Sequence, residues 1–402
     1  MRLNPTGLAV GTSAVLAALA AFRPFPQSAT PPITVPFELR SDLALVRAEV
    51  NGQSALLILD SGSGVNVVDS ALAASAQLDM SGPRARVMGR SDATMQLGRA
   101  RSLRVGAAEL RDALVAPSDL AAVQARVGRD VRGTIGYDLF ARYVVVVDYR
   151  RRQLTLHDPG TFAYTGTGVV LPVTTATRVP ITDAVLVTRR MGRIPVRLNL
   201  DLGSSAWAVR LGTRVVEKYG LDEDTATVRA PFGAGVGGAS VGKLLRLPEL
   251  RLGPLVIGRP STALSSDSTG AFGRSASQDG TVGVPVFRRT LVIFDYARSR
   301  VIVEPRERLD LPDSVDASGL SLTVGQDSTG PLGVEYVVPG SAAADAGIRA
   351  GDELLRVDDR TASATSLHAT RLLLRTAGTT RRLTIRRGES TLTVSIVLRW
   401  II

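Results

Sequence analysis

The chain repeats one pattern at long range, and this repeat limits the folds open to it. The tetrapeptide at residues 133–136, Gly-Thr-Ile-Gly, recurs at residues 280–283 as Gly-Thr-Val-Gly. Each copy is followed at the same spacing by a phenylalanine, a β-branched run and an Asp-Tyr pair. These landmarks lie the same 147 residues from their second copies, for example from Phe140 to Phe287. Because this period is too long for a solenoid, the sequence predicts two homologous lobes.

An aspartate stands upstream of each copy, where an apolar strand is expected to end. Asp60 opens the tetrad Asp-Ser-Gly-Ser after Leu-Leu-Ile-Leu, and Asp201 opens Asp-Leu-Gly-Ser after Leu-Asn-Leu. The glycine allows a tight turn, so either tetrad alone is consistent with an ordinary turn aspartate. The duplicated surroundings instead predict a pair of carboxylates, one from each half. Two carboxylates around one water can share a proton, activate the water and protonate a leaving amine; which aspartate plays which part is left open.

Residues from about 33 to 308 resemble the retropepsin-like and pepsin-like aspartic proteases. The resemblance rests on the two tetrads and on the hydrophobic-Gly pairs downstream of them, which fit the segment near the catalytic loop in that family. It implies a mainly β fold, two small β-barrel lobes with a cleft between them, and peptide hydrolysis without a metal or organic cofactor. The implied site consists of catalytic Asp60 and Asp201, the supporting residues Ser61, Gly62, Ser63, Gly203 and Ser204, and the lobe-framework residues Ile135, Gly136, Val282 and Gly283.

The residue after each aspartate distinguishes the two tetrads. In the family it is Thr or Ser, and its hydroxyl hydrogen-bonds across the lobe interface beneath the dyad; Ser61 conforms and Leu202 does not. If Leu202 fills the family position, a buried backbone group loses its partner, which costs about 1–3 kcal/mol. We expect Ser63 and Ser204 to donate their hydroxyls to the carboxylates. Because both aspartates come from one chain, catalysis needs no dimer, and a monomer is expected.

A glycine-rich stretch at residues 232–240 matches a dinucleotide-binding fingerprint in form only. No strand-to-helix context surrounds it, and Leu244 stands where a P-loop needs Ser or Thr. We interpret the stretch as a hairpin over the cleft, with a counterpart near residues 88–90. In the family one such hairpin is a flap that excludes water and holds the substrate backbone. The candidate flap glycines are Gly89, Gly235 and Gly237; which hairpin is the flap, or whether each is an ordinary loop, is left open.

The segment from residue 318 onward looks like a PDZ domain. Residues 338–352, Val-Pro-Gly-Ser-Ala-Ala-Ala-Asp-Ala-Gly-Ile-Arg-Ala-Gly-Asp, are close to the bacterial PDZ signature. The resemblance implies a groove that takes an extended peptide as an added strand, so a peptide or protein ligand is expected there. The carboxylate-binding loop of the family maps to Gly319, Leu320, Ser321 and Leu322, with Ser321 in place of the usual glycine.

Composition argues against several other functions. The net charge is +11, but the arginines are scattered and no basic run is interleaved with aromatics, so nucleic-acid binding is not expected. The absence of cysteine excludes disulfides, thiolate catalysis and cysteine-ligated zinc. The two histidines, His157 and His368, have no neighbour at metal-ligand spacing. We therefore expect no metal and no cofactor.

The N-terminus predicts export. Arg2 precedes an apolar stretch at residues 8–22, which is shorter than the roughly 20 residues that a membrane span needs. Ala18-Leu19-Ala20 provides a small-residue cleavage motif. The favoured interpretation is a cleaved signal peptide, which places the protein in the periplasm or another extracytoplasmic compartment. The alternative is an uncleaved segment that tethers the protein to the inner membrane.

The sequence thus predicts a signal peptide or anchor plus linker (1–29), a first lobe (30–165), a second lobe (166–310) and a PDZ domain (318–402). We expect an aspartic endopeptidase that hydrolyses peptide bonds through a water activated by Asp60 and Asp201, with the PDZ domain recruiting a polypeptide substrate. The alternative is a catalytically weak or inactive peptide-binding scaffold acting through the PDZ domain. Leu202 is the residue that favours this alternative.

Overall fold

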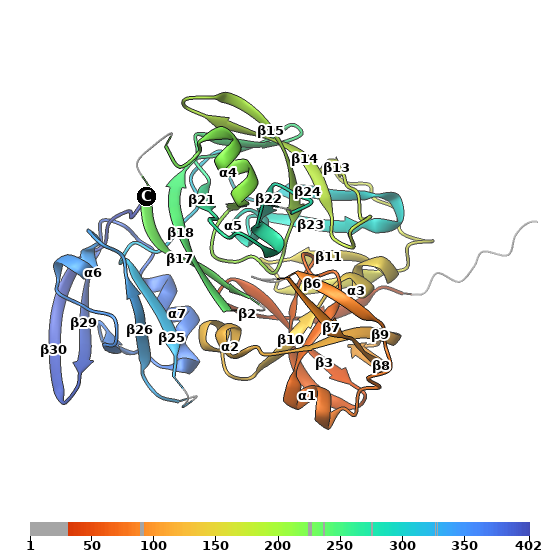
Figure 1. Cartoon of the computed structure of the whole chain (residues 1–402), viewed down its shortest axis with the longest axis horizontal. Helices are drawn as coiled ribbons and strands as arrows, with labels where there is room; N and C mark the ends of the chain where they lie inside the picture. The colour runs from red at the N-terminus through yellow and green to blue at the C-terminus, as the bar shows by residue number, and fades with distance from the viewer. Residues whose placement is uncertain are drawn as a thin grey trace, which may run out of the picture. The chain divides into compact units, whose positions relative to one another are not determined.

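Strands account for far more of the described chain than helices do in the computed structural model (Figure 1). The structure describes residues 31–402, apart from residues 89–91, 224–226, 236–237, 275, 326 and 328. The expected signal or anchor segment, residues 1–29, lies outside the described residues. Within the described part of the chain, no helix is both long enough and apolar enough to cross a bilayer.

The first lobe is a curled sheet with the strand order β2-β3-β4-β10-β5-β9-β8, in which β3 also pairs with β8. This extra pairing joins the two ends of the six-stranded path from β3 to β8 and closes a barrel. The last five residues of β4 are all buried, as expected for an apolar run covered on both faces. The elements of this lobe are β2 (Glu38–Arg40), β3 (Leu43–Val50), β4 (Gln53–Leu59), β5 (Asn66–Asp69), α1 (Ser70–Ser75), β6 (Arg84–Met88), β7 (Asp92–Gln96), β8 (Gly98–Val105), β9 (Ala108–Ser118), α2 (Ala121–Val127), β10 (Val131–Ile135) and α3 (Tyr137–Arg142).

The second lobe repeats this local topology in a nine-stranded sheet, β17-β18-β21-β16-β22-β15-β14-β19-β20. In both lobes a short strand, β10 or β22, runs parallel to the strand that leads to the aspartate and antiparallel to the strand after it. The elements are β14 (Ile181–Thr188), β15 (Gly192–Leu200), β16 (Val209–Leu211), α4 (Thr213–Tyr219), β17 (Val228–Gly235), β18 (Gly238–Arg246), β19 (Glu249–Leu252), β20 (Leu255–Gly258), β21 (Ser261–Leu264), η1 (Gly270–Phe272), β22 (Gly280–Val282) and α5 (Val284–Phe287).

A six-stranded sheet with strands from both halves of the chain joins the lobes, in the order β1-β12-β11-β23-β24-β13. At its centre, β11 pairs with β23 and Val146 lies opposite Ile293. These two residues are equivalent positions of the 147-residue repeat, so the sheet is symmetric about their contact. The elements are β1 (Ile33–Pro36), β11 (Val144–Asp148), β12 (Gln153–His157), β13 (Val169–Pro172), β23 (Thr290–Asp295), η2 (Tyr296–Arg298) and β24 (Arg300–Pro305).

The C-terminal domain has its own sheet, β25-β26-β27-β29-β30, with the short β28 paired to β27, and its own apolar core. Its first helix begins at Ser341, whose hydroxyl accepts a hydrogen bond from the Ala344 N–H at 3.3 Å, as expected for an N-cap. β25 is an edge strand. The elements are β25 (Leu320–Val324), β26 (Leu332–Val337), α6 (Ala342–Asp345), β27 (Glu353–Val357), β28 (Arg360–Thr361), η3 (Ala364–Ser366), α7 (Leu367–Leu373), β29 (Thr380–Arg387) and β30 (Ser390–Val397).

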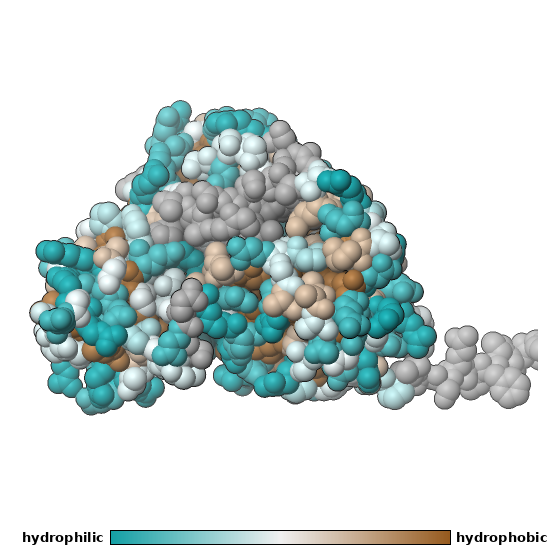
Figure 2. Space-filling view, turned by 60° about the horizontal axis from the view of Figure 1, so that its bottom comes forward, coloured by the Kyte–Doolittle hydropathy of each residue, from teal (hydrophilic) through white to brown (hydrophobic). Residues whose placement is uncertain are grey.

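The domains pack together, and the chain from residue 32 to residue 402 forms one unit. The face seen in Figure 2 is largely hydrophilic, with small separate apolar spots. Large exposed apolar side chains of the described residues come from distant parts of the sequence, for example Met80, Met191 and Trp400.

Candidate active site

Each aspartate of the two tetrads lies at the end of a buried strand and is held there by its own backbone. Asp60 follows β4, and its N–H donates to the Ile135 carbonyl at 3.0 Å. Asp201 follows β15, and its N–H donates to the Val282 carbonyl at 2.9 Å. Ile135 and Val282 are fully buried. The two predicted framework strands thus fix the point at which each catalytic candidate leaves its sheet.

The tetrad glycines bring the two carboxyl groups together across the lobe interface. A Cβ atom on Gly62 would lie 2.5 Å from Asp201 Oδ1, and one on Gly203 would lie 2.5 Å from Asp60 Oδ1. Each glycine N–H also donates to the carboxylate of its own tetrad, at 2.9 Å for Gly62 and 2.8 Å for Gly203. The two carboxyl groups hydrogen-bond each other. Each glycine therefore supplies both a donor and the space that the opposite carboxyl group occupies.

Burial raises the pKa of both carboxyl groups above the ordinary aspartate value. For Asp60 the pKa rises well above that value, because the charge of Asp201 and the shared hydrogen bond add to the effect of burial. For Asp201 burial also raises the pKa, while the Gly203 N–H, the hydrogen bond to Asp60 and the charge of Arg210 oppose the rise. Asp60 and Asp201 are intermediate in exposure when the whole residue is considered. Such a pair retains a proton at pH values where isolated aspartates have lost theirs.

The hydroxyl of Ser61 connects the lobes directly beneath the carboxyl groups. It donates to the Leu200 carbonyl at 2.7 Å and accepts from the Leu202 N–H at 3.0 Å. Both Ser61 and Leu202 are fully buried. Leu202 occupies the position in the second lobe that matches Ser61, and its side chain packs into the main apolar core. Leucine has no hydroxyl, so the mirror-image pair of hydrogen bonds does not form.

The Ser63 hydroxyl does not bind the group that the sequence predicts. It donates to the Val65 carbonyl at 2.7 Å, two residues further along the loop, and not to a carboxylate. The backbone carbonyls of Ser63 and Ser204 instead accept from the N–H groups of Tyr137 and Val284, at 3.0 and 2.7 Å. These serines tie each catalytic loop to the helix that follows the framework glycine.

The framework glycines Gly136 and Gly283 lie so close to the tetrads that a side chain would not fit. A Cβ atom on Gly136 would overlap the Ser63 carbonyl, and one on Gly283 would overlap the Ser204 carbonyl. Both glycines have negative φ. The requirement at these positions is therefore the close approach of two backbone segments.

Sequence reasoning missed a buried asparagine behind the first tetrad. Asn66 is fully buried, its Oδ1 accepts from the Gly136 N–H at 3.0 Å, and its Nδ2 donates to Asp138 and to the Leu114 carbonyl. In the second lobe the Gly283 N–H donates to the Ala208 carbonyl instead. The sequence signal for this role is a single amide side chain within the apolar run after Asp60, because a buried polar side chain needs hydrogen-bond partners.

A partly buried arginine in the second lobe was also missed. Arg210, on β16, makes an ion pair with Asp267 at 3.1 Å, and its guanidinium stacks on the Phe272 ring at 3.5 Å. Burial lowers its pKa to about 10. Arg210 pairs with Thr281 on β22, while in the first lobe Val67 pairs with the equivalent Thr134. The two halves therefore carry a cation and an apolar residue at matching positions.

Two hairpins occupy the segments expected to cover the cleft. β6 and β7 form a separate two-stranded sheet, whereas β17 and β18 extend the sheet of the second lobe. Gly235 ends β17 and pairs with Gly238. Gly89 and Gly237 lie outside the described residues. Which hairpin serves as a flap stays a prediction.

The four residues assigned to the PDZ ligand loop lie at the start of β25. Gly319 has a φ of +84°, and a Cβ atom there would overlap the Ser341 side chain. Leu320, Ser321 and Leu322 are the first three residues of the edge strand. The loop and strand are thus where a strand-adding peptide would bind.

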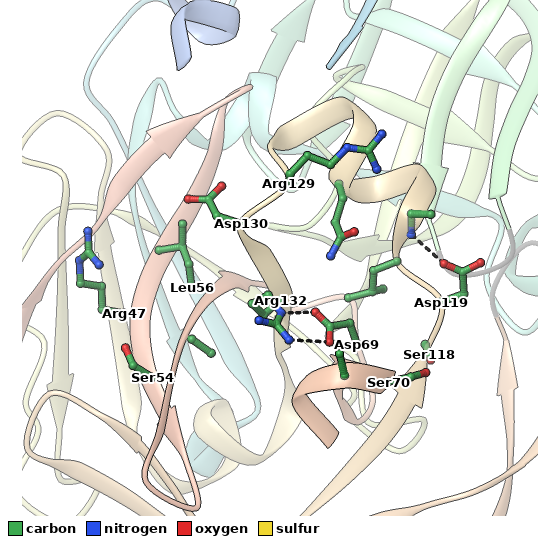
Figure 3. Close-up of a pocket in the computed structure, with 15 residues that line it drawn as sticks. Arg47, Ser54, Leu56, Asp69, Ser70, Ser118, Asp119, Arg129, Asp130 and Arg132 are labelled. Carbon is green, nitrogen blue, oxygen red and sulfur yellow. Dashed lines mark hydrogen bonds and ion pairs between the residues drawn. The ribbon is translucent and has the colours of Figure 1, made fainter. Parts of the chain in front are cut away.

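A pocket of about 770 Å³ lies on the first lobe, and neither aspartate of the dyad lines it (Figure 3). Its walls come from β3, β4, α1, α2 and the start of β10. Arg132 points into it and makes a paired ion contact with Asp69. Across the described residues, no group of three or more His, Cys, Asp or Glu side chains is placed to hold a metal ion.

Comparisons with known proteins agree with the sequence-based family assignment. Residues 46–139 match the aspartyl protease family model, and residues 333–387 match the PDZ domain model. A crystal structure of an aspartic proteinase from Irpex lacteus covers 70% of this chain and 98% of its own chain, with 12% sequence identity and a TM-score of 0.44. No curated protein matches the chain. The expected mainly β fold, with barrel-like lobes followed by a PDZ domain, is confirmed.

Proposed function

We propose that the protein is an aspartic-type endopeptidase. The observation that carries the proposal is the meeting of two carboxyl groups, Asp60 from one lobe and Asp201 from the other, each beside the glycine of the opposite tetrad, with raised pKa values and a shared hydrogen bond. The match of the first lobe to the aspartyl protease family supports it. Leu202 weakens the support beneath the dyad but leaves both acids in contact.

The reaction follows from one proton shared between two carboxyl groups. The ionised member removes a proton from water, and the water oxygen forms a bond to the scissile carbonyl carbon. The protonated member donates a hydrogen bond to the carbonyl oxygen, which gains negative charge. The C–N bond then breaks, and the leaving nitrogen receives a proton from the pair. Water is consumed, and the products are a carboxyl group and an amine.

The test compares wild type with Asp60→Asn and Asp201→Asn on an unfolded protein substrate such as casein, from pH 3 to pH 8. We expect each variant to lose at least about 100-fold in kcat, since removing one member of a catalytic unit removes most of its effect. Asp119→Asn is the matched control, because its carboxylate only caps the Ala121 N–H in the first lobe. If wild type and both dyad variants digest the substrate equally, or none digests it, the proposal fails.

A second function, favoured by the single observation of Leu202, is peptide binding without hydrolysis. In that case the protein acts as a scaffold that binds peptide through the PDZ domain, and the peptide is not hydrolysed. Mass spectrometry of a peptide library after prolonged incubation separates the two. Intact peptides that remain bound to wild type and to Asp60→Asn with equal affinity would favour the binding protein over the enzyme.

We further propose that the chain is exported and acts as a monomer on polypeptides outside the cytoplasm. The apolar N-terminal stretch and its Ala-Leu-Ala motif support export, and the presence of both acids in one chain supports a monomer. N-terminal sequencing of the mature protein would test export. A mature chain that still begins at Met1 would favour a retained anchor over a cleaved signal.

A further inference from the structure

Backbone carbonyls on the free edge of β25, the edge strand of the PDZ domain, already accept hydrogen bonds. The Leu322 carbonyl accepts from Arg371 Nη2 at 2.7 Å, and the Val324 carbonyl, two residues on, accepts from Arg129 Nη2 at 3.3 Å. Arg129 Nε also donates to the Gly325 carbonyl at 2.9 Å. Alternate carbonyls on one edge are the acceptors that an added strand would use. Arg371 belongs to the PDZ domain itself, whereas Arg129 belongs to the first lobe, so the first lobe takes the Val324 and Gly325 positions.

Two segments of the first lobe enter between β25 and α7, and we call residues 41–42 and 126–129 the wedge. Arg371, on α7, donates to the Ser41 hydroxyl and, at 2.8 Å, to the Arg126 carbonyl. Arg126 pairs with Glu335 and donates to Ser321 Oγ at 3.4 Å. The wedge therefore contacts both walls of the groove in which a peptide would lie.

An ion pair closes the α7 side of the groove. Arg375 contacts Asp42 at 2.5 Å, and the Asp42 side chain is only 4% exposed. Burial by itself would raise the pKa of Asp42, but the charge and hydrogen bond of Arg375 outweigh burial and lower it. Removing one partner of such a buried ion pair leaves the other charge unpaired, which is strongly destabilising. The pair therefore makes docking of the wedge in this position specific.

The loop that would bind a peptide carboxylate is occupied from within the chain. The Asp316 carboxylate accepts from the Ser318 N–H at 2.9 Å and from the Gly319 N–H at 2.6 Å. The next N–H, that of Leu320, donates to Ser318 Oγ at 3.1 Å. Asp316 is half-buried, and this burial raises its pKa to about 6. A free C-terminal carboxylate would find the first donors of this loop already satisfied.

The same docking reaches the hairpin of the second lobe. Helix α2 contacts β25, β17 and β18, and in Figure 1 it lies beside β25 and below the lower end of β17. Tyr336 Oη, on β26, donates to the Arg229 carbonyl on β17 at 3.3 Å. Val338 of the PDZ domain shares an apolar cluster with Trp207 and Ala230 of the second lobe. Movement of the PDZ domain would therefore uncover the base of this hairpin.

We propose that the wedge is an intrachain occupant of the PDZ groove, and that an extended peptide adding to β25 must displace it. Displacement separates the PDZ domain from α2 and from the base of the β17–β18 hairpin, so a bound peptide loosens that hairpin. Because Asp316 fills the carboxylate loop, the competing peptide is recognised by its backbone and not by a free C-terminus. The consequence for proteolysis rests on the proposed function, but the docking does not.

Hydrogen exchange on the full chain tests the docking without any use of activity. Arg129→Glu should make exchange at β25 and β17 at least about 10-fold faster, because local opening sets the exchange rate. Arg101→Glu is the matched control, since Arg101 is exposed on β8. Asp42→Asn gives a milder second variant with the same expected direction. Unchanged exchange at β25 and β17 in both wedge variants would overturn the proposal.

Competition is measured with a fluorescent library of random decapeptides, in free-acid and amide forms, with all proteins in an Asp60→Asn background to limit digestion. We expect the Arg129→Glu protein to bind at least about 10-fold more tightly than the protein with the intact wedge, equally for acid and amide forms. Each of three results would overturn the proposal: equal binding with and without the wedge substitution, a strong preference for the free acid, or no binding by either protein. A failed protease test would leave these outcomes unaffected.

Discussion

Replacement of Ser61 by alanine tests the support beneath the dyad. The Ser61 hydroxyl is fully buried and joins two backbone groups of the other lobe, the Leu200 carbonyl at 2.7 Å and the Leu202 N–H at 3.0 Å. Alanine keeps the Cβ and removes only the oxygen. Leu202 offers no hydroxyl that could replace it, so the change removes the hydrogen bonds of this position across the interface.

The magnitude follows from the two groups left behind. A buried donor or acceptor without a partner costs about 1–3 kcal/mol, and here one donor and one acceptor lose the same partner. Partial relaxation of the loop lowers the sum, and we expect Ser61→Ala to lose about 2–4 kcal/mol of unfolding free energy. Ser63→Ala is the matched control, because its hydroxyl makes one bond within its own loop, at 2.7 Å to the Val65 carbonyl. That change should cost about 0.5–1.5 kcal/mol.

Urea unfolding followed by tryptophan emission measures this difference, since Trp207 lies buried in the second lobe. We also expect kcat on casein to fall more than KM rises, because the hydroxyl positions the acids and does not touch substrate. If Ser61→Ala and Ser63→Ala lose the same free energy within about 0.5 kcal/mol, the single hydroxyl does not hold the lobes together as described.

The remaining predictions concern the dyad and its neighbours. Leu202→Thr removes about two buried carbon groups, worth about 1.6 kcal/mol, and adds two hydrogen bonds of about 1 kcal/mol each. Its unfolding free energy, measured with urea, should therefore lie within about 1 kcal/mol of wild type. Leu202→Ala adds no hydrogen bond and should lose about 2–5 kcal/mol of unfolding free energy. Burial raises the pKa of Asp60, so the stabilising contribution of its protonated form is complete below the unfolded-state pKa of about 3.9 and is lost as pH rises through the folded-state pKa. Asp60→Asn should therefore gain in Tm relative to wild type as pH rises from 4 to 8, and a constant difference would contradict the raised pKa. Gly62→Ala places a Cβ 2.5 Å from Asp201 Oδ1 and should abolish casein cleavage, while Gly325→Ala, with no atom within 4 Å of the new Cβ, should leave it unchanged.

The duplicated register allowed the two-lobed fold to be predicted from the sequence. A constant offset requires equivalent strands in equivalent places, and Val146 and Ile293 lie opposite each other at the centre of the joining sheet. The positions of Asp60 and Asp201 followed from the same reasoning, because each stands at the end of a strand that the repeat marks. Local sequence and its repetition were sufficient for these features.

Side-chain partners at the site could not be obtained in the same way. The Ser63 hydroxyl has an acceptor two residues away in its own loop, and only the folded turn shows that this acceptor is nearer than the carboxylate. The docking of Arg129 on β25 joins residues 195 and 196 positions apart. Such contacts depend on the shapes of two finished domains, which no local pattern encodes.

The two halves of the site have diverged in their support while keeping their acids. Ser61 faces Leu202 across the interface, and Val67 corresponds to Arg210, whose charge acts on Asp201. Burial raises the pKa of both carboxyl groups, and the charge of Arg210 opposes that rise at Asp201. The surroundings of the two carboxyl groups are therefore unequal before any substrate arrives. A symmetric site would have to acquire this inequality from the substrate, whereas here the sequence of the second lobe already provides it.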